Sequence, residues 1–199
     1  PEDWFIGQAL VFPEDEAYDI LRPAYRTGPT AREVAAPIYD RVKGLSELEK
    51  KQYLDLNLWL PGDILLKADK MSMAHSIELR VPYLDRVVME EAAAYPAAYK
   101  IAGDTKAVLR AAANQTLPDA WANRKKKGFP VPIAKWLEDS KFSAVVKQSF
   151  TSDIAAQYFH PDKLCALLED PAHNRRKIWT AYTFLVWHQQ FFESARYAK

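Results

Sequence analysis

Thirteen prolines cut this chain of 199 residues into short segments, whereas glycine occurs only six times. Proline has no backbone N–H to donate, so it ends helices or occupies their first turn, and it is excluded from central strands. Between the prolines, apolar residues recur at helical spacing, and no run alternates polar and apolar residues over the length of a strand. We therefore predict an all-α fold with more than half of the residues in helices.

Capping motifs and prolines set the expected ends of these helices. Residues 30–33 (Thr-Ala-Arg-Glu) and 46–49 (Ser-Glu-Leu-Glu) match the capping box, in which a hydroxyl and a carboxylate each bond the other residue's backbone N–H. Asp85 and Thr105 are further expected N-caps. The expected helices cover residues 14–21, 31–42, 47–59, 86–95, 106–115, 118–122, 133–137, 141–150, 161–168 and 175–196, with a central helix that begins at Pro61.

The composition is that of an ordinary soluble protein, with 49% hydrophobic and 27% charged residues. A formal net charge of +1 gives no field that would attract nucleic acid or an anionic membrane. No apolar run is long enough for a membrane span and no signal peptide is recognisable, so we expect a cytoplasmic protein. The single Cys165 excludes an internal disulfide. Because the first residue is Pro1, we expect a piece of a longer chain, folded as one helical domain over residues 1–199.

The first candidate site lies in the stretch 67–85. Pro82 cannot continue a helix and pushes the residue before it towards extended geometry, so Glu78 and Arg80 are expected in extended chain beyond a helix end. Two residues apart there, their side chains point the same way. A carboxylate beside a guanidinium is either a functional site or a structural ion pair. The residues alone favour the structural pair, because most local ion pairs are structural.

The second candidate site is the basic run at residues 125–127. Three lysines followed by Gly128, Pro130 and Pro132 predict a loop over residues 124–132. A solvated loop is the commonest explanation of such a run. A nucleic-acid site would need a broader basic face with exposed aromatic residues. The third alternative is an anion site for phosphates, in which Gly128 provides flexibility.

Both candidate sites fall in long ungapped motifs. The segment Leu60-Pro61-Gly62-Asp63-Ile64-Leu65, with the stretch 67–85, resembles the "LPDDxLxKxDxxSMAxSxExRxPFLD" signature of the asparagine synthetase family. Gly62 replaces an Asp of the signature, and Tyr83 replaces a Phe. A second block, from Lys106 to Leu137, is similar to the family's "K-x-x-L-R … LP … R-x-K-x-G-F-x-x-P … W-L" sequence, in the family's order and spacing.

The resemblance implies an amide-forming ligase. Proteins of this family make asparagine from aspartate, ATP and ammonia released from glutamine, through an acyl-adenylate and with loss of pyrophosphate. At the matching positions, Glu78 would assist formation of the intermediate, and Lys126 would lie by the departing phosphates. Arg80 and Arg124 are the implied substrate or phosphate contacts. Asp63 is a further candidate contact, and the implied Mg²⁺ would have it as a ligand.

Two parts of the family's machinery are missing from this sequence: the Ser-Gly-Gly-x-Asp-Ser pyrophosphate loop and the leading catalytic cysteine. The chain therefore resembles the helical C-terminal half of a larger α/β synthetase domain of the ATP-pyrophosphatase type. We expect its partner to be the upstream half of the same chain, with a homodimer as one option for assembly and with neither nucleic acid nor membrane as a partner. We expect the chain alone to be inactive.

Two other functions stay open at this point. A related adenylating synthetase on the same scaffold would amidate another carboxylate, and the upstream substrate-binding residues would distinguish it. A non-catalytic helical module would instead bind a partner through Trp-rich faces. A large exposed apolar patch would favour that module, although removal of a covering half of the domain would expose the same patch.

Overall fold

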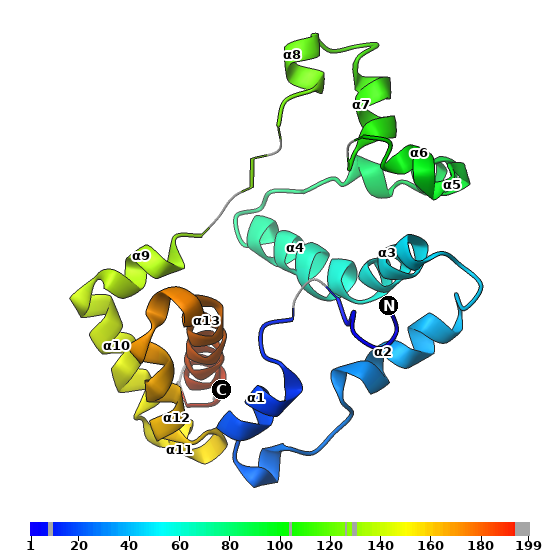
Figure 1. The fold of residues 1–199 in the computed structure, drawn as a ribbon. Coiled ribbons are helices and arrows are strands. Elements are labelled where there is room, and N and C mark those ends of the chain that lie inside the picture. The colour runs from blue at the N-terminus through cyan, green and yellow to red at the C-terminus, as the bar shows by residue number, and fades with distance from the viewer. Residues whose placement is uncertain (8–9, 104, 126, 129–130, 194–199) are drawn as a thin grey trace. The chain divides into compact units, whose positions relative to one another are not determined.

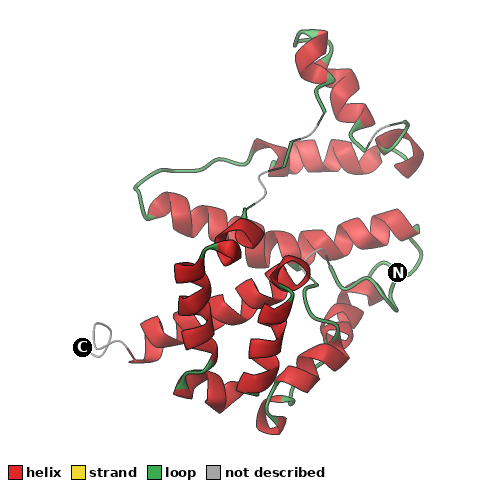
Figure 2. Cartoon of the chain, turned by 60° about the vertical axis from the view of Figure 1, so that its left-hand side comes forward, coloured by secondary structure: helices red, strands yellow, loops and turns green. Residues whose placement is uncertain are grey.

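The computed structural model describes residues 1–199 apart from 8–9, 104, 126, 129–130 and 194–199. Helices make up 68% of the chain, and the described residues contain no strand, only an isolated bridge between Leu21 and Phe159. Figures 1 and 2 show the helices joined by loops throughout. The all-α prediction is confirmed. Among the described residues, no helix is both long enough and apolar enough to cross a membrane.

The chain divides into two compact units, one made of residues 1–8 and 32–128 and the other of residues 9–31 and 129–199. The helices of the first unit are α2 (Ala31–Asp40), α3 (Glu47–Asn57), α4 (Leu66–Met73), α5 (Arg86–Ala94), α6 (Ala97–Lys100), α7 (Ala107–Ala113) and α8 (Asp119–Ala122), with a π-helical turn at Leu60–Leu65 and a 3₁₀ turn at Pro82–Leu84. The helices of the second unit are α1 (Glu14–Ile20), α9 (Ile133–Glu138), α10 (Ser140–Phe150), α11 (Asp153–Tyr158), α12 (Pro161–Ala166) and α13 (Pro171–His188), with 3₁₀ turns at Pro23–Tyr25 and Leu167–Glu169 and a π-helical turn at Gln189–Glu193.

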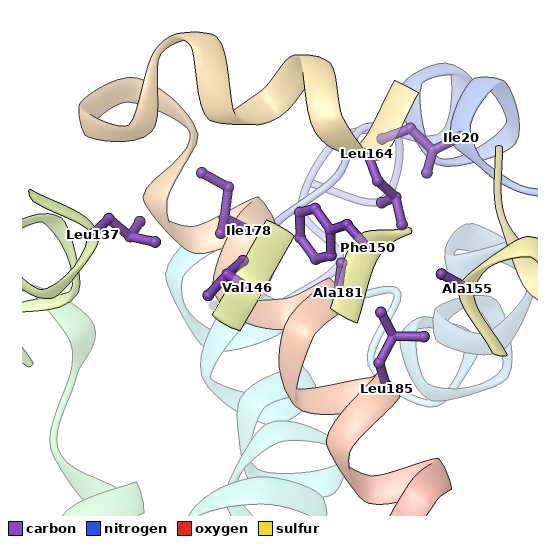
Figure 3. Close-up of a cluster of buried hydrophobic side chains, with 9 residues drawn as sticks. All are labelled: Ile20, Leu137, Val146, Phe150, Ala155, Leu164, Ile178, Ala181 and Leu185. Carbon is purple, nitrogen blue, oxygen red and sulfur yellow. The ribbon is translucent and has the colours of Figure 1, made fainter. Parts of the chain in front are cut away.

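The second unit is built around a continuous apolar core (Figure 3). Three side chains of α13 and two of α10 meet in its centre, and α1, α9, α11 and α12 each add one more. The nine buried residues are Ile20, Leu137, Val146, Phe150, Ala155, Leu164, Ile178, Ala181 and Leu185. Ion pairs Lys163–Asp19 and Lys177–Glu16 hold α1 at the edge of this core. Each fully buried large side chain stabilises the unit by about 1.5–3 kcal/mol.

The first unit has a smaller core, formed by Ala35, Tyr39 and Leu54. The Tyr39 hydroxyl donates a hydrogen bond of 2.6 Å to the backbone carbonyl of Phe5, which brings the N-terminal segment onto α2. The Lys50 ammonium bonds the Glu2 carboxylate. This bond is the main reason why the pKa of Glu2 is lowered to about 2. A few long-range contacts therefore hold the N-terminal segment in this unit.

Most helix ends agree with the sequence. The Ser46–Glu49 capping box is complete, and it holds the pKa of Glu49 below its ordinary value through the hydrogen bonds from Ser46. Asp85 caps α5 by accepting from the Val87 N–H at 2.9 Å. The prediction for Thr105 is wrong, because the N-cap of α7 is Lys106 and no side chain caps it.

Three features of the helix pattern were not predicted. Helix α6 follows Pro96 and is only one turn long, too short for a periodic signal. Helix α11 begins at a Ser152 cap, whose hydroxyl accepts from the Ala155 N–H. The last long helix begins at Pro171 rather than at residue 175, because Asp170 accepts from the His173 N–H and proline suits the first helical position.

The core of the second unit predicts that substitutions at two positions of α10 differ greatly in their effect on stability. Phe150 is fully buried, and Val145 is 49% exposed. Phe150→Ala should reduce the free energy of unfolding of that unit by about 3–5 kcal/mol, through lost burial and a residual cavity. Val145→Ala should change it by less than about 0.5 kcal/mol. Urea unfolding followed by circular dichroism measures both, and equal losses would contradict the packing described here.

Candidate functional site

The first candidate site directly follows the end of α4. Ser76 has a positive φ of 56°, the Ser76 N–H donates to the Met73 carbonyl, and the Ile77 N–H donates to the Ser72 carbonyl, both at 3.0 Å. This pair of bonds around a left-handed residue is a Schellman motif, which satisfies the last carbonyls of a helix. The turn at residues 74–76 therefore closes the helix after Met73, well before Pro82. Pro82 instead begins the 3₁₀ turn that leads into α5.

Glu78 and Arg80 follow this helix end in extended chain, which Figure 2 draws as loop. Their side chains form an ion pair with 2.7 Å between Glu78 Oε1 and Arg80 Nη2, as the spacing of two residues predicted. The Arg80 side chain is 80% exposed and that of Glu78 is 70% exposed. Solvent competes strongly with so open a pair, so it contributes little to stability. The carboxylate is, by the same exposure, accessible to a bound molecule.

Asp63 lies in the π-helical turn before α4, and neighbouring side chains engage its carboxylate. Trp59 Nε1 donates to Asp63 Oδ2 at 3.1 Å, and Lys67 Nζ lies 3.6 Å from Oδ1. Magnesium requires several oxygen ligands, usually carboxylates together with water. Among the described residues, no three His, Cys, Asp or Glu side chains gather as a metal site would need. The Asp63 carboxylate is a local hydrogen-bond acceptor in this structure, and its role as a Mg²⁺ ligand stays a prediction.

The second candidate site, the basic loop, follows α8. Arg124 is exposed, its N–H donates to the Trp121 carbonyl at 3.3 Å, and its own carbonyl accepts from Arg110 Nη1 at 3.1 Å. Lys125 and Lys127 are also described, and Lys125 is exposed. Lys126, the residue singled out by the motif spacing, lies outside the described residues, as do Phe129 and Pro130. The start of the loop is therefore held through its backbone.

The candidate side chains form separate local groups. Among the residues that the structure describes, no hydrogen bond or ion pair joins the Glu78–Arg80 pair to Asp63 or to Arg124. Trp59, Lys67 and Arg110 are polar partners that the sequence reasoning did not assign. The spacing of four residues between Trp59, Asp63 and Lys67 could have indicated the first two, because such positions share a helix face.

Two grooves in the structure lie elsewhere. In the first unit, a groove of about 630 Å³ is lined by α3 and α5, with Trp59, Leu60 and Met89 among its walls. In the second unit, an apolar groove of about 430 Å³ is lined by aromatic residues, including Tyr25, Tyr158 and Phe184. Neither groove is lined by a predicted site residue. The candidate residues that the structure describes are thus on short loops and turns, outside these two grooves.

Comparison with known proteins shows that this chain is similar to asparagine synthetases. The family model described as asparagine synthase matches residues 7–189. Asparagine synthetase (glutamine-hydrolyzing) 1 of Bacillus subtilis is 41% identical over 192 residues, which cover 94% of this chain and 30% of that protein. A putative asparagine synthetase (glutamine-hydrolyzing) of Mycobacterium bovis is 39% identical over 200 residues, covering 96% of this chain and 30% of that protein. The chain thus spans about 30% of the length of these curated relatives. No solved structure matches.

The exposure of the Glu78–Arg80 pair predicts that it is nearly neutral for stability. Glu78→Ala and Arg80→Ala should each change the free energy of unfolding of this chain by less than about 0.5 kcal/mol, since both groups are solvated. Asp85→Ala, in the same segment, should cost about 1 kcal/mol because it removes the cap of α5. Urea unfolding of the three variants tests this. A loss at Glu78 as large as that at Asp85 would make the ion pair structural.

Proposed function

Because this chain belongs to the asparagine synthetase family, we propose that it is the helical C-terminal half of the synthetase domain of a glutamine-hydrolysing asparagine synthetase. Such an enzyme adenylates aspartate with ATP and releases pyrophosphate, and glutamine-derived ammonia then attacks the acyl carbon, from which AMP leaves. The observation that carries the proposal is the ungapped signature from Leu60 to Asp85, within a family match over residues 7–189. The second block, from Lys106 to Leu137, supports the same assignment.

Glu78 is the proposed proton acceptor of this reaction. When ammonia attacks an acyl-adenylate, the nitrogen must lose a proton, and a carboxylate beside the acyl carbon can accept it. Arg80 Nη2 lies 2.7 Å from Glu78 Oε1, so the guanidinium can hold the carboxylate in place for this role. Arg80 is also a candidate contact for the negatively charged substrate. The exposure of both side chains leaves room for a substrate at this position.

Lys126 is the proposed phosphate contact, with Arg124 as a second. Adenylation and loss of pyrophosphate concentrate negative charge on the phosphates, so a fixed cation there stabilises the transition state more than the ground state. The spacing Arg124-x-Lys126-x-Gly128-Phe129 supports Lys126 over its neighbours. None of these roles is assigned through a metal.

The rest of the longer protein is the proposed partner of this chain. Large apolar side chains are exposed along α4, the extended segment and the start of α5, namely Leu66, Met71, Met73, Ile77, Leu79, Val81, Tyr83, Val87 and Val88. Soluble proteins seldom expose so many apolar residues in one stretch without a partner. A covering domain that holds the ATP phosphates would bury them and complete the site around Glu78.

The direct test is an assay of pyrophosphate release. The longer protein should release pyrophosphate from ATP in an aspartate-dependent way, and this chain alone should not. Release that another carboxylate supports better than aspartate would indicate a related amide-forming synthetase instead. If the longer protein adenylates no carboxylate, the helices serve as a non-catalytic interaction module.

The role proposed for Glu78 predicts a selective loss of activity. Glu78→Gln keeps the shape of the side chain but removes the charge and the base, so synthetase turnover should fall by about a hundredfold or more. Glutaminase activity of the same protein should be retained. Glu90→Gln is the matched control, because Glu90 is also exposed and paired with an arginine, with 3.8 Å between Glu90 Oε1 and Arg86 Nε. Wild-type turnover in Glu78→Gln would leave the residue as a partner of Arg80 only.

Alanine substitutions of the three lysines of the basic loop should differ sharply in their effect on turnover. In the longer protein, Lys126→Ala should lower turnover by about a hundredfold, which corresponds to about 3 kcal/mol of lost transition-state stabilisation. Lys125→Ala and Lys127→Ala should have little effect, as expected for solvated charges. Lys126→Arg should restore little, because a planar guanidinium does not replace a compact ammonium. Pyrophosphate release at saturating ATP measures all four, and equal losses at the three positions would indicate a diffuse basic patch.

A further inference from the structure

The backbone conformation of Ser76 sets this residue apart from its neighbours. Its φ of 56° is the one positive value among the non-glycine residues that the structure describes. The Ser76 N–H donates to the Met73 carbonyl at 3.0 Å. The side chain is exposed, and its hydroxyl makes no hydrogen bond to any residue of the described part of the chain. What distinguishes Ser76 is therefore its backbone rather than a side-chain contact.

The turn at Ser76 is also the nearest fixed point to Glu78. Among the described residues, no backbone–backbone hydrogen bond involves residues 78–80. On one side, the Ile77 N–H closes the turn with a hydrogen bond of 3.0 Å. On the other side, the Val81 carbonyl accepts a hydrogen bond of 2.9 Å from the 3₁₀ turn that follows. Glu78 is adjacent to the first of these anchors and three residues from the second, so its position depends mainly on the turn at Ser76.

A short lever connects this turn to the Glu78 carboxylate. Rotation about the backbone of one residue swings all of the chain that follows until the next fixed point. Two residues of backbone span at most about 7 Å, so the direction in which the chain leaves Ser76 restricts where Glu78 can lie. Displacement of a catalytic group by about 1 Å can cost as much as a hundredfold in rate. A modest change of the Ser76 backbone is therefore sufficient to misplace a base at residue 78.

We propose that Ser76 is a positioning residue for Glu78 and acts through its left-handed backbone conformation. The inference depends on the catalytic role proposed above for Glu78. With Ser76 in this conformation, the chain leaves the helix so that Glu78 Oε1 lies 2.7 Å from Arg80 Nη2. A right-handed conformation at residue 76 would instead continue the helix and carry the carboxylate elsewhere. Ser76 thus acts on the reaction through Glu78, and its hydroxyl is not required.

Two substitutions in the longer protein separate the backbone of Ser76 from its hydroxyl. Ser76→Gly removes the hydroxyl but suits the left-handed conformation, so kcat should stay within about twofold of the wild type. Ser76→Thr keeps a hydroxyl but adds a β-branch, which strongly disfavours a positive φ, so kcat should fall by about tenfold or more. The KM for aspartate should change little in either variant. Formation of asparagine from aspartate, ATP and ammonia is the measurement.

A double-mutant cycle tests whether Ser76 acts through Glu78. In a Glu78→Gln background, Ser76→Thr should cost less than about twofold, because the base that Ser76 positions is already gone. Ser140→Thr is the matched control, since Ser140 is exposed and begins α10, and it should leave kcat unchanged. An unchanged circular dichroism spectrum shows that each variant is folded. If Ser76→Thr does not fold, Ser76→Asn takes its place beside Ser76→Gly. Asparagine also tolerates the left-handed conformation, so both variants should keep kcat within about twofold.

The outcomes distinguish this inference from the function on which it depends. If Glu78→Gln lowers turnover but Ser76→Thr keeps wild-type kcat, the inference is overturned and the role of Glu78 stands. The same holds if the effects of Ser76→Thr and Glu78→Gln multiply, because Ser76 then acts independently of the carboxylate. A large loss of kcat in Ser76→Gly or Ser76→Asn would mean that the hydroxyl itself is needed, which also overturns the inference. If Glu78→Gln alone has no effect, the proposed role of Glu78 fails first, and the positioning role fails with it.

Discussion

The left-handed turn at Ser76 is the constraint on which the first candidate site depends. A non-glycine residue in this conformation costs about 1–2 kcal/mol, and the two Schellman hydrogen bonds to Ser72 and Met73 offset that cost. Because the helix stops there, residues 77–81 lie outside any helix, and the side chains of Glu78 and Arg80 can meet in an ion pair. One more helical turn would have wound both residues into α4 and placed them about 200° apart around its axis.

The solvent exposure of the Glu78–Arg80 ion pair bears directly on its role. A structural ion pair stabilises a fold most when it is buried and fully hydrogen-bonded, and the Glu78–Arg80 pair is neither. Yet the turn that places the pair is itself conformationally costly. Local backbone strain of this kind is more common at functional sites than elsewhere. Stability gives little reason to hold these two side chains at this position, which is consistent with the catalytic role proposed for Glu78.

Hydrogen bonds between residues close together in the sequence could be predicted from it, whereas contacts between distant residues could not. The Ser46–Glu49 box and the Asp85 cap depend on neighbours within three residues, so their patterns predicted the bonds that the structure contains. Thr105 failed because α7 begins one residue later than a lone hydroxyl suggested. The Glu78–Arg80 pair followed from spacing, although Ser76 rather than Pro82 ends the helix. The contacts of Arg110 join residues 12 and 14 positions apart, and no local periodicity encodes such a pair.

The two candidate sites share one physical device. In each, hydrogen bonds fix the backbone at or just beyond the end of a helix, and the candidate residue comes two positions after a residue of that fixed stretch. At α4 the donors are backbone N–H groups that follow Ser72, and Glu78 comes two residues after Ser76. At α8 a donor is the Arg110 guanidinium, and Lys126 comes two residues after Arg124. A backbone cap depends only on its own segment, but a side-chain cap from another helix transmits any shift of α7 to the loop. The backbone at Arg124 is therefore tied to a residue 14 positions earlier in the chain, whereas the end of α4 is closed by its own backbone.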